Sequence, residues 1–528
     1  MSIIAILSVL AFVVYLYFKI KTEVHIMQQN SYFNSRYWAW FVSNWQKRIL
    51  WWELLPLVGA VLSMFFYESN LTVSMIGGGL VVAGLLYGSY NYATEVQKKA
   101  LTITPRVRRL MAMCFVVMAC ISLAIWYFVA ACHCNYFYIL STIFSPFGLM
   151  LSAAFISPLE KSINQSYVND AKRKLASMTQ LTVIGVTGSY GKTSVKHFLA
   201  RILSEKYDVL HTPGSVNTTL GVVRIIREQL KPTHQIFIAE MGAKKMGDVR
   251  EICDLVKPNM AILTAIGPEH LDTFGSMENV QKGNFELIES LDNKGKGFLN
   301  ADYDLVKAYN KQNTTLQYYG VQDQSADYTA TNVIYTATGM QFDVQHKGQK
   351  VVTLETKLLG EHNVSNIVAC VAIALTMDIE PNRIAYAVRN LQPVQHRLEI
   401  KRNPGGITII DDAFNSNPTG SRMALEVLAK VQGNTKIVIT PGMIELGNEE
   451  YEYNRKFGTY MLGTCDYVIL VGPKQTKPIQ DGLRDVGFPT DKIYVAKDLP
   501  DATQHLRSFV RAGDVVLYEN DLPDTYKE

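Results

Sequence analysis

The chain has 528 residues, which is room for three or more domains of ordinary size. Its formal net charge of +4 is too small to indicate a nucleic-acid partner, and no basic stripe with interleaved aromatic residues is present. The seven cysteines form no paired CxxC motifs, so neither a zinc ribbon nor a disulfide framework is indicated. The first third is very apolar, whereas the remainder has the composition of a soluble protein.

Five apolar runs occupy the start of the chain, and we interpret residues 1–160 as a transmembrane domain of five helices. The runs lie at about 3–18, 54–67, 71–90, 110–131 and 136–157. Three are long enough to cross a bilayer core, while the first two are at the short end of the roughly 17 to 25 residues required. None carries Asp, Glu, Lys or Arg near its middle, which argues against an ion or proton pathway. The first run lacks a basic n-region and an A-x-A site, so a retained helix is favoured over a signal peptide.

The loops between these runs predict the orientation. Lys and Arg residues gather in the connections that follow the first and third runs, and are absent from the connections that follow the second and fourth. By the positive-inside rule, the charged loops are cytoplasmic. The N-terminus is therefore expected outside, and everything after Pro158 inside.

From residue 181 onward, apolar strands alternate with helical patterns, which is typical of α/β domains with a parallel sheet. Strands are expected at 181–186, 235–240, 260–265 and 297–300, and helices at 193–205, 217–229, 247–256 and 277–291. The segment 319–356 has the pattern of a small β-rich insert. A helix is then expected to run to about 377, with Asn363 as its N-cap. The pattern restarts with a strand at 406–411. We therefore expect an ATP-binding domain at 175–391, with a P-loop ATPase-type parallel sheet, and a Rossmann-like C-terminal domain at 392–528.

The segment 181–195, LTVIGVTGSYGKTSV, joins a β-branched strand to a glycine loop. In loops of this kind the backbone N–H groups point at phosphates, a lysine reaches the outer phosphates, and a threonine hydroxyl sits on Mg²⁺. The candidate nucleotide-binding residues are Gly188, Ser189, Gly191, Lys192, Thr193 and Ser194. The strict Walker spacing is not met, because five residues separate Gly185 from Gly191 and two separate Gly188 from it.

The loop resembles the shorter TGxxGKT form of the Mur ligases, the ATP-dependent enzymes that add amino acids to peptidoglycan precursors. Five later segments resemble motifs of that family in the same order: PGSVNTTLG at 213–221, AEMGA at 239–243, IGPEHL at 266–271, LGEHNVSN at 359–366 and IDDAFNSNP at 410–418. The last is similar to the branch that adds D-alanyl-D-alanine to UDP-N-acetylmuramoyl-tripeptide. The resemblance extends from about 180 almost to the C-terminus, and implies a membrane-anchored ligase of this family.

The resemblance implies a carboxylate–amine ligase with ATP and Mg²⁺ as cofactors. ATP would phosphorylate a carboxylate, an amine would attack the acyl phosphate, and ADP and phosphate would be released. Because this brings anions together, metal and fixed positive charge are needed. Lys192, His270 and Arg397 are the candidate catalytic residues. The first Mg²⁺ would be held by Thr193 and Glu240, and the second by His270.

Other roles follow from the same resemblance. Asn366 would face the adenine and Asp411 the ribose, with Asn415 also at the nucleotide. Arg397 would steady the phosphates on domain closure, or alternatively form a surface pair with Glu399. The candidate substrate-binding residues are Asn217, Thr218 and Lys282.

The chain departs from the family in three places. Many members carry a carbamoylated lysine where this chain, aligned on Glu286, has Asn284. Either the second metal is held with less protein charge, or the helix register shifts so that Lys282 serves. The C-terminal K-G-S segment of the D-alanyl-D-alanine branch is replaced by ENDLPD at 519–524. Finally, the apolar region stands where relatives carry a domain that grips UDP.

The acceptor is therefore expected to be a cell-envelope precursor, either UDP-linked or lipid-linked, and the added group an amino acid or a dipeptide. The expected location is a bacterial-type cytoplasmic membrane with the catalytic domains in the cytoplasm. Three alternatives stay open: a poly-γ-glutamate synthase-like capsule ligase, a transporter powered by the P-loop domain, and a regulatory ATP-binding protein. An LSGGQ-like signature, which would favour the transporter, is missing from the sequence. The sequence does not define an oligomeric state.

Overall fold

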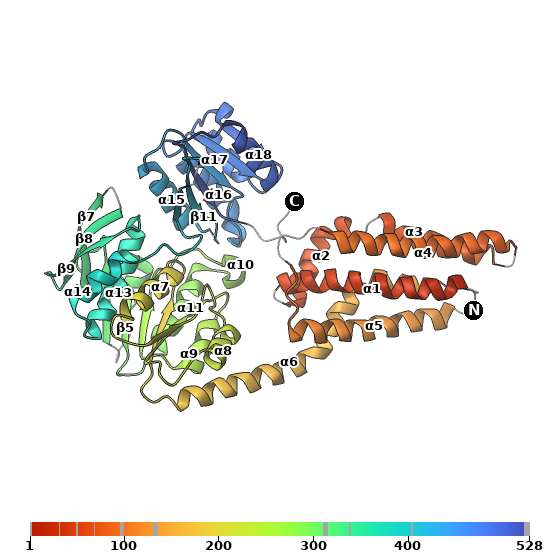
Figure 1. Cartoon of the computed structure of the whole chain (residues 1–528), viewed down its shortest axis with the longest axis horizontal. Coiled ribbons are helices and arrows are strands. Elements are labelled where there is room, and N and C mark those ends of the chain that lie inside the picture. Colours follow the sequence, from red (N-terminus) through yellow and green to blue (C-terminus); the bar gives the residue numbers. More distant parts are fainter. Residues whose placement is uncertain are drawn as a thin grey trace. The chain divides into compact units, whose positions relative to one another are not determined.

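The computed structural model describes residues 3–30, 32–48, 51–67, 69–95, 100–129, 136–309, 315–336, 339–402, 405–414 and 416–521. The chain divides into two compact units, Met1–Gln165 and Ser166–Leu522. The first is a bundle of helices, and the second contains two β-sheets with their covering helices (Figure 1). Each unit is described separately below.

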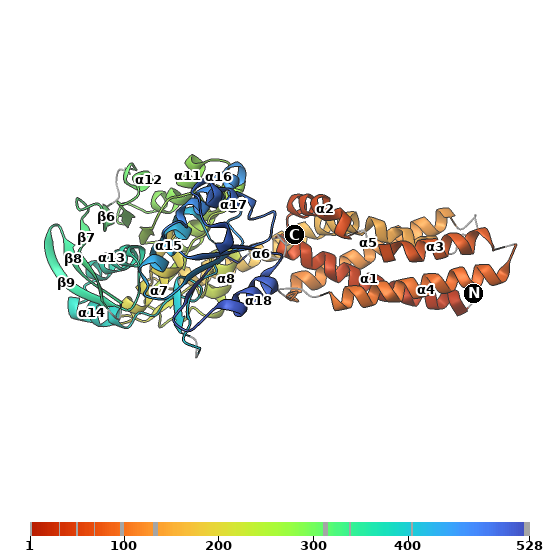
Figure 2. The same ribbon diagram turned by 90° about the horizontal axis from the view of Figure 1, so that it is seen from above.

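The helical unit contains α1 (Ile3–Gln29), α2 (Asn34–Arg48), α3 (Trp51–Phe65), α4 (Leu71–Thr94), α5 (Pro105–Val129), the 3-10 helix η2 (Phe137–Phe144) and the first part of α6 (Ser145–Ala176). Helices α1, α3, α4 and α5 run side by side in both Figure 1 and Figure 2. Four segments of the described residues are long and apolar enough to cross a membrane: Ile3–Gln29, Leu71–Thr94, Pro105–Phe128 and Phe137–Ala176. The segment Glu53–Phe65 is apolar but shorter, so the count of five membrane helices stays a prediction.

Helix α1 is longer than the apolar run 3–18 predicts, and its second half carries charged residues into the interior of the bundle. Lys19 of α1 donates to Glu53 Oε1 of α3 over 2.7 Å. The same oxygen accepts hydrogen bonds from the hydroxyls of Tyr15, at 2.7 Å, and Tyr92, at 2.6 Å. Lys19 is buried. The charge of Glu53 is thus compensated by one ammonium and two hydroxyl groups within the bundle.

Small residues allow α3 and α4 to pack closely. A Cβ atom on Gly77 would lie 2.6 Å from the backbone nitrogen of Ser63, and one on Gly84 would lie 2.7 Å from Cδ of Pro56. Only glycine fits such contacts between helix backbones. Gly77 and Gly84 therefore have a packing role between these two helices.

The second unit begins with a nine-stranded sheet in the order β2-β3-β1-β4-β5-β6-β7-β8-β9. The strands are β1 (Thr182–Thr187), β2 (Val209–His211), β3 (Ile236–Glu240), β4 (Met260–Leu263), β5 (Lys296–Asn300), β6 (Thr315–Gly320), β7 (Tyr328–Thr336), β8 (Gly339–His346) and β9 (Gln349–Thr356). Strands β1 to β6 pair in parallel, and β7, β8 and β9 pair antiparallel. The β-rich segment at 319–356 thus extends the main sheet, because β7 pairs directly with β6.

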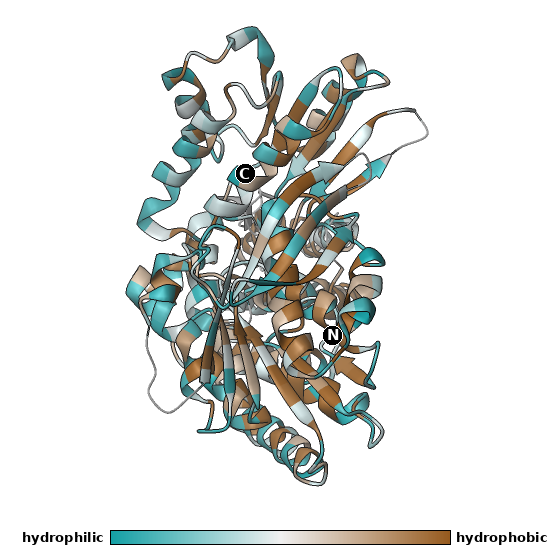
Figure 3. Ribbon diagram, turned by 90° about the vertical axis from the view of Figure 1, so that its left-hand side faces the viewer, coloured by the Kyte–Doolittle hydropathy of each residue, from teal (hydrophilic) through white to brown (hydrophobic). Residues whose placement is uncertain are grey.

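Helices cover both faces of this sheet. Successive side chains of a strand point to opposite faces, and the apolar side chains on each face need a layer that buries them. Ile184 packs among residues of α7 (Lys192–Leu203), α13 (Glu361–Thr376) and α14 (Pro381–Arg389). Its neighbour Val183 packs on the other face, with α8 (Thr219–Glu228), α9 (Asp248–Val256) and α11 (Met277–Glu289). Two short helices, α10 (Leu271–Phe274) and α12 (Asp304–Lys307), follow β4 and β5. Figure 3 shows many apolar residues in the strands.

The prediction that Asn363 caps α13 was wrong. The helix begins at Glu361, with Gly360 in the N-cap position. Gly360 has a φ of +93°, which suits glycine. Asn363 lies in the first turn, where its side-chain amide donates to the carbonyl of Leu359.

The second sheet has the order β10-β11-β15-β12-β13-β14. Its strands are β10 (Glu399–Arg402), β11 (Thr408–Asp412), β12 (Lys436–Thr440), β13 (Tyr467–Val471), β14 (Ile493–Ala496) and β15 (Val515–Glu519), all parallel except β10. Helices α15 (Pro418–Lys430), α16 (Glu450–Tyr460) and α17 (Lys477–Asp485) cover one face, and α18 (Leu499–Phe509) covers the other. The 3-10 helices η3 (Gly447–Glu449) and η4 (Thr490–Lys492) lie in loops. This order differs from the 3-2-1-4-5-6 order of dinucleotide-binding folds, so the Rossmann-like expectation is not confirmed.

Candidate functional site

The glycine loop follows β1 and leads directly into α7. Gly188 has a φ of +134° and Gly191 a φ of +80°, both in the left-handed region. A Cβ atom on Gly188 would lie 2.2 Å from Oγ1 of Thr264, and one on Gly191 would lie 2.7 Å from Oδ1 of Asn366. Both positions therefore require glycine for conformation and for space. The second contact places Asn366, from α13, directly against the loop.

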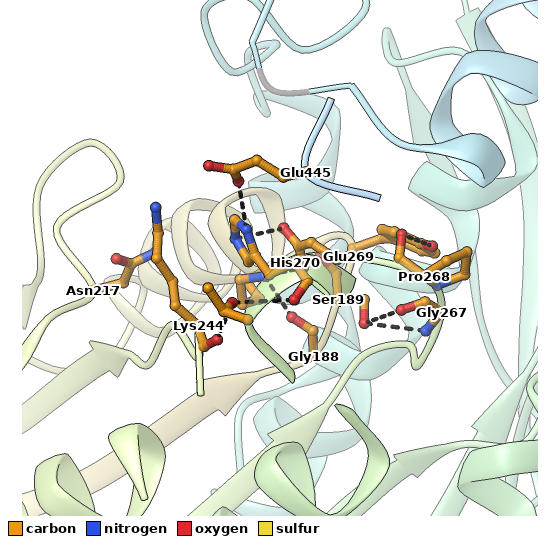
Figure 4. A network of polar contacts seen from close by, with 12 residues as sticks. Gly188, Ser189, Asn217, Lys244, Gly267, Pro268, Glu269, His270 and Glu445 are labelled. Atoms are coloured by element: carbon orange, nitrogen blue, oxygen red, sulfur yellow. Dashed lines mark hydrogen bonds and ion pairs between the residues drawn. The ribbon is translucent and has the colours of Figure 1, made fainter. Parts of the chain in front are cut away.

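Ser189 ties the loop to the segment that follows β4. Its backbone N–H donates to the carbonyl of Ala265 over 2.7 Å. Its hydroxyl donates to the carbonyl of Gly267 over 2.9 Å and accepts from the Gly267 N–H over 3.0 Å (Figure 4). The hydroxyl of Ser189 thus anchors the loop, while Ser194 is half-buried in the first turn of α7. The first N–H groups of that helix have no partner within it, and they suit an anion.

Lys192 folds back over the loop that precedes it. Its ammonium donates to the carbonyl of Ser189 over 3.0 Å and to Glu269 Oε2 over 3.3 Å. Its third partner is the carbonyl of Gly188. The arrangement holds a positive charge at the loop, where the outer phosphates of a nucleotide would be bound.

Glu240 ends β3, the strand beside β1, and its carboxylate is almost completely buried. Oε1 accepts from the Thr193 hydroxyl at 3.1 Å and from the Asn217 amide at 3.2 Å. Oε2 accepts from the buried ammonium of Lys196 at 2.8 Å. Burial lowers the pKa of Lys196, against the opposing effect of Glu240. The hydroxyl and carboxylate oxygens together suit Mg²⁺, which prefers oxygen ligands.

His270 follows β4 and occupies the N-cap position of α10, with a φ of +52°. Its Nδ1 lies 2.6 Å from Oε2 of Glu445, and its Nε2 lies 3.8 Å from Oε1 of Glu269. Figure 4 shows the Glu445 carboxylate directed at the imidazole ring. Within the part of the chain that the structure describes, no three His, Cys, Asp or Glu side chains form a metal cage. Mg²⁺ commonly completes its coordination with phosphates and water, so one or two protein ligands suffice.

Asn284 and Lys282 are the two residues considered for the position of the family's carbamoylated lysine, and they lie in different surroundings. Asn284 is buried, where its Oδ1 accepts from the Thr187 hydroxyl at 3.0 Å and its amide donates to Val280. Lys282 has a 60% exposed side chain and pairs with Glu278. Asn284 therefore occupies the buried side of α11 and Lys282 its exposed side, and a role of Lys282 at the second metal stays a prediction.

The other two candidate substrate residues lie between β2 and α8. Asn217 contacts Glu240 and packs so closely on Gly242 that a Cβ there would lie 2.7 Å from its amide. Thr218 is exposed at the N-cap of α8. Asn217 therefore belongs to the Glu240 cluster, whereas Thr218 faces solvent beside it.

Arg397 is half-buried before β10, with its guanidinium 4.5 Å from the centre of the Phe414 ring. Burial lowers its pKa, and the carboxylates of Asp412, Glu269 and Glu240 act in the opposite direction. The alternative surface pair with Glu399 is not the arrangement found, because that carboxylate pairs with Lys401.

Asp411 accepts from His396 and Lys401, each at 2.8 Å. Burial acts to raise its pKa, but the hydrogen bonds from Lys401 and His396 outweigh burial and hold the pKa below its usual value. Its role at the ribose stays a prediction. Asn415 lies outside the described residues.

The carboxyl edge of the second sheet carries two acidic residues for which the sequence analysis proposed no site role. Glu519, fully buried at the end of β15, accepts from the hydroxyls of Ser416, Ser421 and Thr440. Burial raises its pKa. Burial, together with the charge of Glu519, also raises the pKa of Asp412 to about 7. Both residues lie at the carboxyl ends of neighbouring parallel strands, where ligands of α/β sheets bind. That position in the sequence could have identified them as candidate site residues.

Comparison with known proteins points to one family. The profile of the Mur ligase middle domain matches residues 186–374, and that of the Mur ligase glutamate ligase domain matches 396–518. A relative from Bacillus subtilis (strain 168), named UDP-N-acetylmuramoyl-tripeptide–D-alanyl-D-alanine ligase, is 28% identical over 340 residues, which are 64% of this chain and 72% of the relative. A protein of the same name from Escherichia coli (strain K12) is 29% identical over 301 residues, covering 55% of this chain and 66% of the relative.

Solved structures share the fold over about two thirds of the chain. MurF from Acinetobacter baumannii has a TM-score of 0.61 and 24% identity, covering 69% of this chain and 78% of that one. MurF ligase from Thermotoga maritima, in complex with ADP, also has a TM-score of 0.61 and 24% identity, covering 68% and 80%. The fold likeness and the two profile matches are consistent with the site geometry at β1, β3 and β4.

Proposed function

Given that the chain belongs to the Mur ligase family, we propose that it is a membrane-anchored, Mg²⁺-dependent ligase of cell-wall precursors. It is an ATP-dependent enzyme that forms C–N bonds. The observation that carries the site assignment is the convergence of Lys192, the Thr193–Glu240 pair and His270 after β1, β3 and β4, which are neighbours in one sheet. Ligands of open α/β sheets bind at this edge.

The reaction consumes ATP in two balanced steps. The acceptor carboxylate takes the γ-phosphoryl group of ATP to give an acyl phosphate and ADP, and the amine then displaces phosphate to form the amide. Lys192 holds positive charge at the phosphates, and the loop N–H groups bind their oxygens. Thr193 and Glu240 would hold one Mg²⁺ and His270 a second, and these ions supply the charge compensation for two approaching anions. Arg397 adds a fixed cation whose pKa responds to the charges of Glu269 and Glu240.

The added group is an amino acid or a dipeptide such as D-alanyl-D-alanine. Support comes from the names of the relatives, which act on D-alanyl-D-alanine and a UDP-N-acetylmuramoyl-tripeptide. The matched region leaves part of each relative and part of this chain uncovered. We propose that the acceptor is a muropeptide carried on UDP or on a membrane lipid.

Membrane insertion of the helical unit is supported by the side chains on its outer surface. Large apolar residues are exposed along the long helices: Leu7, Leu10, Val13, Val14, Met75, Ile76, Leu86, Val116, Leu123, Trp126 and Phe128. An aqueous surface rarely carries so continuous an apolar covering, whereas a bilayer favours it. The proposed location is the cytoplasmic membrane, with the N-terminus outside and the α/β unit in the cytoplasm.

The test is a ligase assay on the full chain purified in detergent. ATP, Mg²⁺ and either D-alanyl-D-alanine or single amino acids are offered with UDP-linked and lipid-linked muropeptides in parallel, and mass spectrometry follows the acceptor. We expect one acceptor to gain the mass of the added group while ADP is released, and Lys192→Ala to form far less product than the wild type in the same time. A ladder of repeated additions would instead indicate a polymerising ligase. No mass gain on either carrier, with no ADP release, would contradict the proposal.

A further inference from the structure

A carboxylate from the second sheet reaches the candidate metal ligand of the first. Glu445 lies in the loop after β12, and its Oε2 is 2.6 Å from Nδ1 of His270, which follows β4. Both side chains are largely buried, with exposed fractions of 21% and 13%. Figure 4 shows the pair beside the loop residues Gly188 and Ser189. The contact joins residues 175 positions apart in the chain, and the Mg²⁺ and ATP roles proposed above do not use it.

The backbone at this contact is constrained on both sides. His270 has a φ of +52° and Glu445 a φ of +64°, values that residues with a Cβ adopt rarely. Gly447, two residues later, has a φ of +60°, and a Cβ there would be in ordinary van der Waals contact with α10, 3.4 Å from the nitrogen of Asp272. Strained conformations of this kind persist where the surroundings determine them, and they concentrate at functional sites.

The loop that carries Glu445 is built by its own sheet. The N–H of Met443 donates to Oδ1 of Asn454, and the Asn454 amide returns a bond to the carbonyl of Met443, at 2.8 and 2.9 Å. The carbonyl of Gly442 accepts from the Asn520 amide at 2.6 Å. Glu445 therefore projects from a loop whose base is held by α16 and by the segment that follows β15.

The chemistry of imidazole gives this contact a consequence. When a carboxylate accepts the Nδ1–H of a histidine, the proton is held on that nitrogen, and Nε2 keeps a free lone pair for a metal ion. The carboxylate also fixes the plane of the ring. On the Nε2 side lies Glu269, which is bonded to Lys192.

We propose that Glu445 is a positioning residue, which sets the tautomer and the ring orientation of His270 and so completes the second metal site from the other sheet. This inference rests on the proposed function, since it presumes that His270 binds metal. The metal affinity of His270, beside the nine-stranded sheet, would then depend on the loop after β12 in the six-stranded sheet.

The test is Mn²⁺ binding to the full chain in detergent, with a non-hydrolysable ATP analogue present and free Mn²⁺ followed by electron paramagnetic resonance. Glu445→Gly removes the side chain and relieves the positive φ, so it is expected to fold. We expect it to weaken the weaker Mn²⁺ site about 10- to 100-fold, as loss of an orienting partner of a metal-bound histidine does. Glu445→Gln, which keeps an oxygen acceptor, should weaken that site less.

Two further variants make the result specific. Glu452→Gln removes an exposed carboxylate on α16 and should leave both Mn²⁺ affinities unchanged. His270→Ala should weaken the same site, and adding Glu445→Gly to it should cause no further loss, because a positioning residue acts only through its ligand. In turnover, the Mg²⁺ concentration for half-maximal rate should rise in Glu445→Gly while the KM for ATP stays constant.

The outcomes separate failure of the inference from failure of the proposed function. Unchanged Mn²⁺ binding in Glu445→Gly, with a weakened site in His270→Ala, would overturn the positioning role alone. A further loss in the double variant would do the same. A wild-type chain that binds no Mn²⁺ with the nucleotide analogue would contradict the proposed Mg²⁺–ATP site itself.

Discussion

In the helical unit, large apolar side chains point outward along α1, α4 and α5, whereas in the α/β unit side chains of the same kind fill both faces of each sheet. Two ion pairs extend the comparison. Lys19–Glu53 in the bundle and Lys196–Glu240 in the α/β unit are both buried, with N–O distances of 2.7 and 2.8 Å. The two pairs differ in the other hydrogen-bond donors that contact the carboxylate.

In the bundle, the remaining partners of Glu53 are tyrosine hydroxyls that lie within the unit. At Glu240, the remaining partners are Thr193 and Asn217, which belong to the phosphate loop and to a candidate substrate segment. A buried carboxylate satisfied by scaffold residues stabilises a fold. One satisfied by the residues of a binding loop can exchange them for a metal ion. The comparison teaches that burial and pairing alone do not identify a site.

The largest expected effect is that of Lys192→Ala on the α/β unit. We expect the ligase rate to fall by a factor on the order of 10³, because a fixed positive charge at the transferred phosphate is lost. The measurement is ADP release with both acceptors, alongside the circular dichroism spectrum, which should match that of the wild type. Retention of a tenth of the activity would show that the charge at this loop is dispensable.

The next effect falls on the bundle. Glu53→Leu leaves the Lys19 ammonium buried without its carboxylate, which should cost about 3 to 5 kcal/mol in the stability of the helical unit. Thermal unfolding in detergent would measure it. The double variant Lys19→Met/Glu53→Leu should recover most of the loss, because neither charge of this pair is then left without its partner. Binding of an ATP analogue should be unchanged in both variants. Weaker binding would mean that the Lys19–Glu53 pair also affects the candidate nucleotide site, contrary to a purely structural role.

A smaller effect is expected at Asp412, whose pKa is raised from 3.8 to about 7 in the folded protein. A carboxyl group of this kind binds its proton more tightly in the folded chain than in the unfolded chain. Its contribution is therefore most favourable below about pH 4, is lost as pH rises from about 4 to about 7, and is constant above that.

Asp412→Asn should remove this pH dependence, with a change on the order of 1 kcal/mol after allowance for partial exposure. Thermal unfolding of the α/β unit at pH 5 and pH 8 tests it. The wild type should lose more stability than the variant between these values. Parallel losses would mean that Asp412 is ionised throughout.

The smallest effect is expected at Lys282. Its ammonium is exposed and pairs only across one helical turn with Glu278, so Lys282→Ala should change stability by less than about 0.5 kcal/mol. The ligase rate should stay within about twofold of the wild type, since the side chain of Lys282 is exposed to solvent. A large rate loss with intact folding would support the candidate substrate role that the sequence suggested.

Local patterns predicted the central sheet well. The alternation around Val183 and Ile184 and the glycine loop each depend on neighbours in sequence, so β1, β3, β4 and β5 lie within a few residues of the expected ranges. Gly188 and Gly191 were identified by type, and the structure adds the reason, which is their contact with Thr264 and Asn366.

Long-range pairing was harder to predict. The segment 319–356 has a strand pattern, but its pairing with β6 depends on tertiary contacts that periodicity does not encode. The extension of α1 to Gln29 was missed because Lys19 and Glu23 ended the apolar run, and their partners lie on other helices. The contact between His270 and Glu445 has no local sequence signal, because the two residues are 175 positions apart in the chain.

Asn284 has one more consequence, which concerns dissolved gas. A lysine amine at that position could take up carbon dioxide reversibly and so acquire its negative charge from the surrounding bicarbonate pool. The amide of Asn284 is not nucleophilic, and it is already occupied by Thr187 and Val280. The charge at position 284 therefore does not depend on carbon dioxide, and the enzyme should work at the same rate in buffers purged of that gas.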